Sequence, residues 1–107
     1  MDGWEIDPAT VNRLRQTGQA VTILDVREPW ERQIAAVEGS LDIPMAQVPA
    51  QLDMLPRNGV LAVLCHHGAR SFRVTEWLRS RGFNNAINLA GGIDAWAAEV
   101  DDTITRY

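Results

Sequence analysis

Runs of apolar residues alternate along the chain with segments in which apolar residues recur every three or four positions. Short apolar runs are typical of buried strands, and the recurring spacing is typical of amphipathic helices. Glycine, proline and aspartate stand between these segments, where turns and helix ends favour them. The pattern predicts strands at 4–6, 20–24, 41–43, 60–64 and 86–89, and helices at 8–17, 29–34, 45–55, 71–81 and 93–98.

Strands and helices that follow one another in this order, with short connections, indicate an α/β fold with a parallel sheet. Helices then cover both faces of the sheet, which gives three layers. A chain of 107 residues has room for one core and not for two. We therefore expect a single domain over residues 1–107, in which residues 100–107 form a tail that lies over the surface.

The only cysteine of the chain, Cys65, directly follows the apolar run at 60–64. Ligands bind at the carboxyl ends of parallel strands, and the N–H groups that open a following helix stabilise a thiolate. Gly68 permits inward-pointing N–H groups, Arg70 adds a permanent positive charge, and no loop side chain is large enough to cover the sulfur from within. The position of Cys65 alone is equally compatible with a buried structural cysteine. The residues that follow it favour a nucleophilic sulfur.

Three segments of the chain together resemble the single-domain rhodanese family. Cys-x-x-Gly-x-Arg-Ser, beginning at Cys65, resembles the active-site loop of that family. The segment at 25–31, continued as far as Pro44, resembles its first signature, and the segment at 82–96 resembles its C-terminal signature. The resemblance covers essentially the whole chain. It implies the three-layer rhodanese-like fold, with a central five-stranded parallel sheet and helices on both faces.

The resemblance also implies an activity, the transfer of a sulfane sulfur. The Cys65 thiolate would take the sulfur from thiosulfate or another persulfide, and a thiophilic acceptor (cyanide, a thiol or a protein) would remove it from the Cys65 persulfide. With one cysteine in the chain, no internal disulfide can release this sulfur, so the acceptor must be external. The residues expected to hold the donor and the persulfide are His66, His67, Gly68, Ala69, Arg70 and Ser71.

Asp25 and Arg27 are expected to support the site, because Asp25 ends a strand that should neighbour the strand before Cys65. Asp25 could hydrogen-bond the loop amides or Arg27, and a helix-capping role has equal weight. No cofactor and no metal are expected. The adjacent histidines make a poor metal site, because neighbouring residues rarely direct both rings at one ion.

Two differences from the family pattern concern histidines. Ala36 stands where the first signature usually has a histidine, so a local contact is lost or replaced. His66 and His67 stand where two-domain relatives that specialise in thiosulfate have permanently basic residues. Because histidine changes its charge near neutral pH, tight binding of thiosulfate as the physiological donor is in question.

Two other classes of function fit the same layout. Cysteine phosphatases and arsenate reductases have a Cys-x5-Arg pattern, whereas four residues separate Cys65 from Arg70. This shorter loop encloses a smaller ring of backbone N–H groups, which suits one sulfur atom better than a phosphoryl group. Noncatalytic rhodanese-like modules that act in binding or regulation commonly lose the cysteine, which this chain keeps.

A net charge of −4, without a basic run, argues against nucleic acid as a partner. No stretch approaches the length that spans a membrane, and the acidic start at 1–5 lacks the apolar core of a leader. A single cysteine is consistent with a reducing compartment, so we expect a cytoplasmic protein. The expected partners are a small-molecule sulfur donor and a thiol or protein acceptor.

Glycine and tryptophan residues outside the loop also carry expectations. Gly91-Gly92 is expected to let the last helix pack closely on the sheet, with direct contact to the substrate as the alternative. Trp30 is expected to lie exposed near the rim of the pocket. Trp77 and Trp96 are expected in the core.

Overall fold

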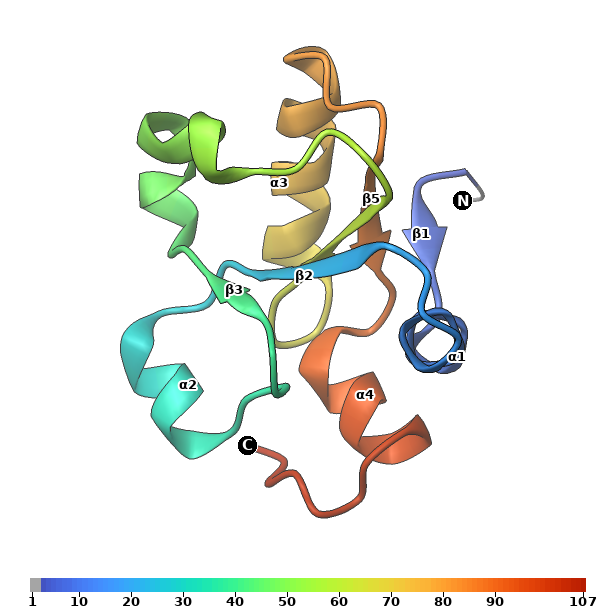
Figure 1. The fold of residues 1–107 in the computed structure, drawn as a ribbon. Coiled ribbons are helices and arrows are strands. Elements are labelled where there is room, and N and C mark those ends of the chain that lie inside the picture. The colour runs from blue at the N-terminus through green and yellow to red at the C-terminus, as the bar shows by residue number, and fades with distance from the viewer. Residues whose placement is uncertain (1–2) are drawn as a thin grey trace.

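Five parallel strands form one sheet in the computed structural model, which describes residues 3–107 (Figure 1). The order of the strands is β1–β5–β4–β2–β3, and this parallel sheet confirms the predicted α/β class. Of the acidic start of the chain, Met1 and Asp2 lie outside the described residues. The strands are β1 (Glu5–Ile6), β2 (Val21–Asp25), β3 (Leu41–Asp42), β4 (Val60–Leu64) and β5 (Ala86–Leu89).

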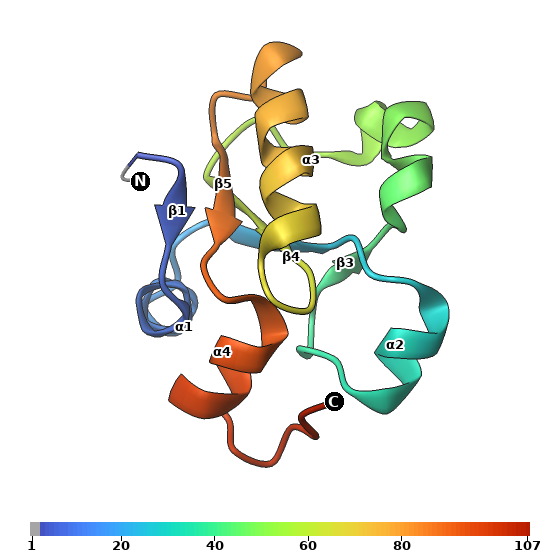
Figure 2. The same cartoon turned by 180° about the vertical axis from the view of Figure 1, so that it is seen from behind.

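Helices cover both faces of this sheet (Figure 1, and from behind in Figure 2). The helices α1 (Pro8–Gln16) and α4 (Gly92–Glu99) pack on one face, over one cluster of buried apolar residues. On the other face, α3 (Ala69–Ser80) and η1 (Met45–Met54) pack over a second cluster. The short helix α2 (Pro29–Ile34) follows β2. Within residues 3–107, none of these helices is long and apolar enough to cross a bilayer.

The central strand β4 presents its side chains alternately to the two faces of the sheet. Leu61 and Val63 belong to the core under α3 and η1, and Cys65 continues the alternation on that side. Ala62 and Leu64 belong to the core under α1 and α4. Because both faces are covered, the whole strand is apolar, as its sequence predicts. The alternation therefore decides on which face the sulfur lies.

Two predicted helices differ from the structure. The segment at 45–55 forms a 3-10 helix, η1, which is broken at Gln51, where φ is −125° and ψ is 29°. Pro49 within it has no N–H to donate, and short 3-10 pieces tolerate this better than a continuous α-helix does. The helix α3 begins at Ala69 rather than at residue 71, because Gly68 caps it in a left-handed conformation. Arg70 therefore lies in the first turn of α3.

The tail after α4 is held more closely than a loose surface tail would be. Ile104 and Tyr107 are partly buried and pack against the core under α1 and α4. The last residues lie between α2 and α4 (Figure 1). Trp96 is buried and Trp30 is exposed, as predicted, whereas Trp77 is only partly buried, which corrects its expected place in the core.

Gly92 provides a test of the close packing predicted for Gly91-Gly92. Its φ is +64°, and a Cβ there would lie 2.4 Å from the carbonyl oxygen of His66. We expect Gly92→Ala to lower the free energy of unfolding, measured by urea denaturation, by about 2 kcal/mol more than Gly18→Ala does. Gly18 is the matched control, because its φ is +78° and a Cβ there would meet no atom within 4 Å. Equal losses in the two variants would contradict the packing role.

Candidate active site

The N-terminus of α4 holds the loop that follows β4. The amide of Ile93 donates to the carbonyl of Cys65 at 2.8 Å, and the amide of Asp94 donates to the carbonyl of His66 at 3.2 Å. The first N–H groups of a helix have no partner within it, so they are available for these contacts. The missing side chain of Gly92 permits the approach, because a Cβ would meet both carbonyls. Because the carbonyls of Cys65 and His66 point toward α4, the N–H group of Gly68 can point toward the sulfur.

Two donors contact the sulfur of Cys65. The amide of Gly68 donates to Sγ at 3.1 Å, and the hydroxyl of Ser71 donates to it at 3.2 Å. Gly68 has a φ of +106°, a backbone conformation that side chains other than hydrogen rarely allow. Two of the residues predicted for the cradle thus contact the sulfur.

The sulfur is nevertheless enclosed. Cys65 is only 1% exposed, although the sequence predicts no loop side chain large enough to cover it. The cover comes from other segments, because Cys65 shares an apolar cluster with Val26, Ile43, Val48 and Val74. The side chain is therefore packed away from solvent and still contacts both of its donors.

Asn88, which the sequence indicates only as part of a family signature, orients Ser71. Its Nδ2 donates to the carbonyl of Gly68 at 3.2 Å and to Oε2 of Glu5 at 2.9 Å. With both amide hydrogens engaged, Oδ1 faces Ser71 and accepts from the hydroxyl that also contacts the sulfur. Ser71 and Asn88 have no exposed surface. The single proton of the Ser71 hydroxyl is thus shared between Asn88 and Sγ.

Arg70 does not offer the unpaired positive charge that the sequence suggests. Its Nη1 and Nη2 each lie 2.8 Å from a carboxylate oxygen of Glu31. The guanidinium of Arg70 lowers the pKa of Glu31 to about 2, and Glu31 in turn raises the pKa of Arg70. Both groups are therefore charged at neutral pH and neutralise each other. Sequence reasoning does not single out Glu31 beyond its place in the first signature.

Asp25 and Arg27 form a buried ion pair, with 2.7 Å between Oδ2 and Nη2 and no exposed side-chain surface. The amide of Arg27 also donates to Oδ1 of Asp25 at 3.0 Å. Within residues 3–107, all donors to the Asp25 carboxylate belong to Arg27, which selects the contact with Arg27 from the predicted alternatives. Arg27 further donates to the carbonyl of Ala35 at 2.8 Å, beside the exposed Ala36. The pair thus fixes the turn that follows α2.

Tyr107 joins this buried pair to the loop, and nothing in the sequence signals the contact. Its hydroxyl accepts from Nη1 of Arg27 and donates to Oε1 of Glu31, each at 2.9 Å. Burial raises the pKa of Tyr107, so the hydroxyl keeps its proton at neutral pH. The ring stacks on His66 with a centroid distance of 3.8 Å, and His66 stacks on His67 at 3.9 Å. Both histidine rings are thus engaged in stacking.

The structure divides the predicted loop residues into four groups. Gly68 and Ser71 contact the sulfur, whereas Arg70 contacts Glu31 and the two histidines stack. Ala69 is exposed at the start of α3. In the part of the chain that the structure describes, no three histidine, cysteine or carboxylate side chains come together as a metal site would need.

Comparison with known proteins places these features in a family. Residues 7–99 match the family model of the rhodanese-like domain. The chain belongs to this family. A sulfurtransferase of Allochromatium vinosum is 30% identical over 93 residues, which cover 87% of each chain. The crystal structure of a rhodanese-related protein from Thermoplasma volcanium matches with a TM-score of 0.81 and 33% identity, covering 91% of this chain and 93% of that one.

Other relatives are much longer than this rhodanese-like domain. An adenylyltransferase and sulfurtransferase of Zea mays is 33% identical over 102 residues, which cover 89% of this chain but 21% of that protein. The chain thus spans about a fifth of this relative's length. The family match and the shared fold confirm the resemblance that the three sequence segments indicate.

The pairing of Glu31 with Arg70 should make the stability of the domain depend on acid. A carboxyl whose pKa is 4.5 in the unfolded chain and about 2 in the folded one stabilises the fold fully above pH 4.5. This contribution is lost as the pH falls toward 2. We expect the free energy of unfolding of Glu31→Gln, measured by urea denaturation, to fall less over this range than that of the unaltered protein.

Other carboxyls with a lowered pKa, such as those of Asp7 and Asp94, titrate in both proteins and cancel in the comparison. If the two stability curves run parallel across this range, the Glu31 carboxylate contributes nothing to acid sensitivity and the prediction is wrong.

Proposed function

We propose that this rhodanese-like domain transfers a sulfane sulfur through a persulfide on Cys65. The observation that carries the proposal is the contact of Sγ with the amide of Gly68 and the hydroxyl of Ser71. Hydrogen-bond donors held in place before reaction stabilise an anion where it forms. The family and its sulfurtransferase relatives support the same chemistry.

In the first half-reaction, the Cys65 thiolate attacks the outer sulfur of thiosulfate or of another persulfide. A bond forms between Sγ and that sulfur, and the bond between that sulfur and the rest of the donor breaks. The leaving group keeps the electron pair and departs as sulfite or as a thiolate. Cys65 is left as a persulfide anion, with the same charge as the thiolate it replaces.

In the second half-reaction, an external acceptor takes the outer sulfur and Cys65 leaves as a thiolate. Cyanide, a cellular thiol or a protein thiol is nucleophilic enough for this step. The acceptor is external because the chain has no second cysteine to form a disulfide. The single free cysteine also supports a reducing compartment, so a cytoplasmic location forms part of the proposal.

The burial of Cys65 favours one other function, a noncatalytic rhodanese-like module that binds a partner. Retention of the sulfur together with both of its donors supports the catalytic function over this one. The phosphatase class has less support, because Glu31 already occupies both terminal nitrogens of Arg70. A phosphoryl group in the loop would have to compete with that carboxylate.

Sulfur uptake tests the role of Cys65 directly. Incubation with thiosulfate or with inorganic polysulfide should add the mass of one sulfur atom, measured by intact mass spectrometry. Cys65→Ser should gain no sulfur, because a hydroxyl cannot carry a persulfide, and its free energy of unfolding should change by about 1 kcal/mol at most. Uptake by Cys65→Ser would refute the role of Cys65. Turnover of a phosphate ester without uptake would favour the phosphatase class.

Glu31→Gln should make thiosulfate a better donor. The substitution leaves the charge of Arg70 unneutralised near the loop, which favours binding of a doubly charged ion. We expect the KM for thiosulfate to fall about two- to fivefold, the range of a partly exposed charge contact, as measured by thiocyanate formation from cyanide. Arg70→Ala is the matched variant and should raise this KM. An unchanged KM in both variants would make the pair purely structural.

A further inference from the structure

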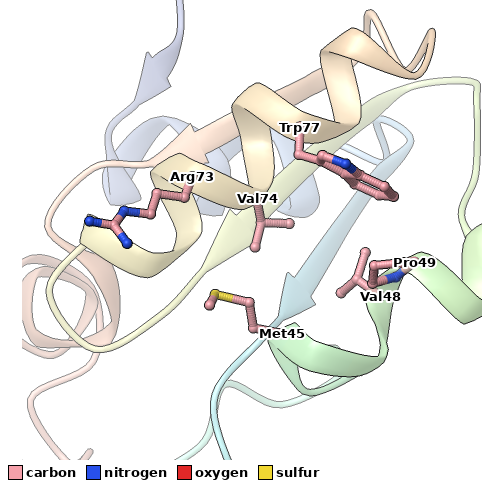
Figure 3. Close-up of a pocket in the computed structure, with 6 residues that line it drawn as sticks. All are labelled: Met45, Val48, Pro49, Arg73, Val74 and Trp77. Carbon is pink, nitrogen blue, oxygen red and sulfur yellow. The ribbon is translucent and has the colours of Figure 1, made fainter.

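An apolar pocket opens between η1 and α3, on the face of the sheet to which Cys65 points (Figure 3). Its volume is about 190 Å³. Val48 and Val74 line the pocket and also belong to the apolar cluster that contains Cys65. The pocket therefore borders the apolar cluster to which Cys65 belongs. Its lining residues are Met45, Val48, Pro49, Arg73, Val74 and Trp77.

Arg73 is the one charged residue of this lining. It lies at the end of the pocket opposite Trp77 (Figure 3), about one helical turn beyond Ala69 in α3. Among the ion pairs that the described residues form, none involves Arg73, whereas Arg70 is paired with Glu31. The pocket thus combines an apolar lining with one charged lining residue that forms no ion pair within residues 3–107.

We infer that this pocket binds the carbon body of an organic thiol, the sulfur acceptor of the site, with its apolar chain toward Trp77 and one negative charge at Arg73. The inference rests on the proposed function. An apolar lining favours a carbon chain in proportion to the area it buries, and it offers nothing to a small doubly charged ion. Because Glu31 already pairs with Arg70, the site also offers no free Arg70 charge to a small doubly charged ion, and this favours an organic ligand as well.

Sulfur transfer to this acceptor balances without any further reagent. The acceptor thiolate attacks the outer sulfur of the Cys65 persulfide and forms a new S–S bond. The bond between that sulfur and Sγ breaks, and its electron pair returns to Cys65 as a thiolate. The acceptor leaves as a persulfide. The reverse of this step loads Cys65 from a persulfide of the same class, so one pocket serves both directions.

The test uses the full chain, loaded with sulfur by inorganic polysulfide and freed of excess reagent. The rate constant for sulfur loss, measured by intact mass spectrometry, is compared for 2-mercaptopropionate and 2-mercaptohexanoate, whose thiol-bearing carbons are alike. Each added methylene that enters the pocket should raise the rate constant about two- to fourfold, so the longer thiol should be at least about eightfold faster. The neutral amide of 2-mercaptohexanoate should react more slowly than the acid.

Two variants and two controls locate the effect. Met45→Asp should remove the advantage of the longer thiol, and Arg73→Gln should remove the preference for the acid over its amide. Met54→Asp and Arg13→Gln should keep both preferences. Met54 belongs to η1 but does not line the pocket, and the exposed Arg13 lies in α1, on the other face of the sheet.

A second readout does not depend on sulfur transfer. Addition of 2-hydroxyhexanoate, which has no thiol, should shift the indole N–H resonance of Trp77 in NMR spectra. Equal rate constants for the two thiols, or an unshifted Trp77 resonance, would overturn the inference and leave sulfur loading intact. Failure of polysulfide to load Cys65 would overturn the proposed function instead, and the Trp77 resonance would still decide whether the pocket binds.

Discussion

The contact between α4 and the loop after β4 is the constraint on which the rest of the site depends. The first amides of α4 donate hydrogen bonds to the carbonyls of Cys65 and His66. These bonds fix the peptide planes of the loop so that the Gly68 amide donates to the sulfur. The contact requires that Gly92 carry no side chain. Since the first amides of a helix need partners in any case, the same hydrogen bonds cap the N-terminus of α4 and shape the loop.

Charges of alternating sign tie the same loop to the core. Asp25, Arg27, Glu31 and Arg70 follow one another in space, and the hydroxyl of Tyr107 bridges the two pairs. Buried ion pairs add little net stability, but losing one partner is costly, so such a network mainly fixes geometry. Because the four charges cancel, the two pairs add no net charge beside the loop.

Local patterns explain why sequence reasoning reached the fold and the place of the sulfur. The apolar run before Cys65 predicts a strand from neighbouring residues alone. The glycine and proline residues at the ends of helices and strands likewise affect only the few residues beside them. Long-range pairings leave no such trace: Glu31 and Arg70 are 39 positions apart in the sequence, and Arg27 and Tyr107 are 80 positions apart. The sequence does not indicate the 3-10 form of η1 for a related reason, since the spacing of its apolar residues does not distinguish it from a short α-helix.

The register of β4 restricts how this chain can vary. The strand is paired along its length with β2 and over part of it with β5, so neither neighbour allows it to slide. Inserting or deleting one residue within β4 would turn every later side chain of the strand, and that of Cys65, to the opposite face of the sheet. The thiol would then turn toward α1 and α4, away from Ser71. A homologue could thus keep every residue of the loop intact and still be inert, through a change in strand length alone.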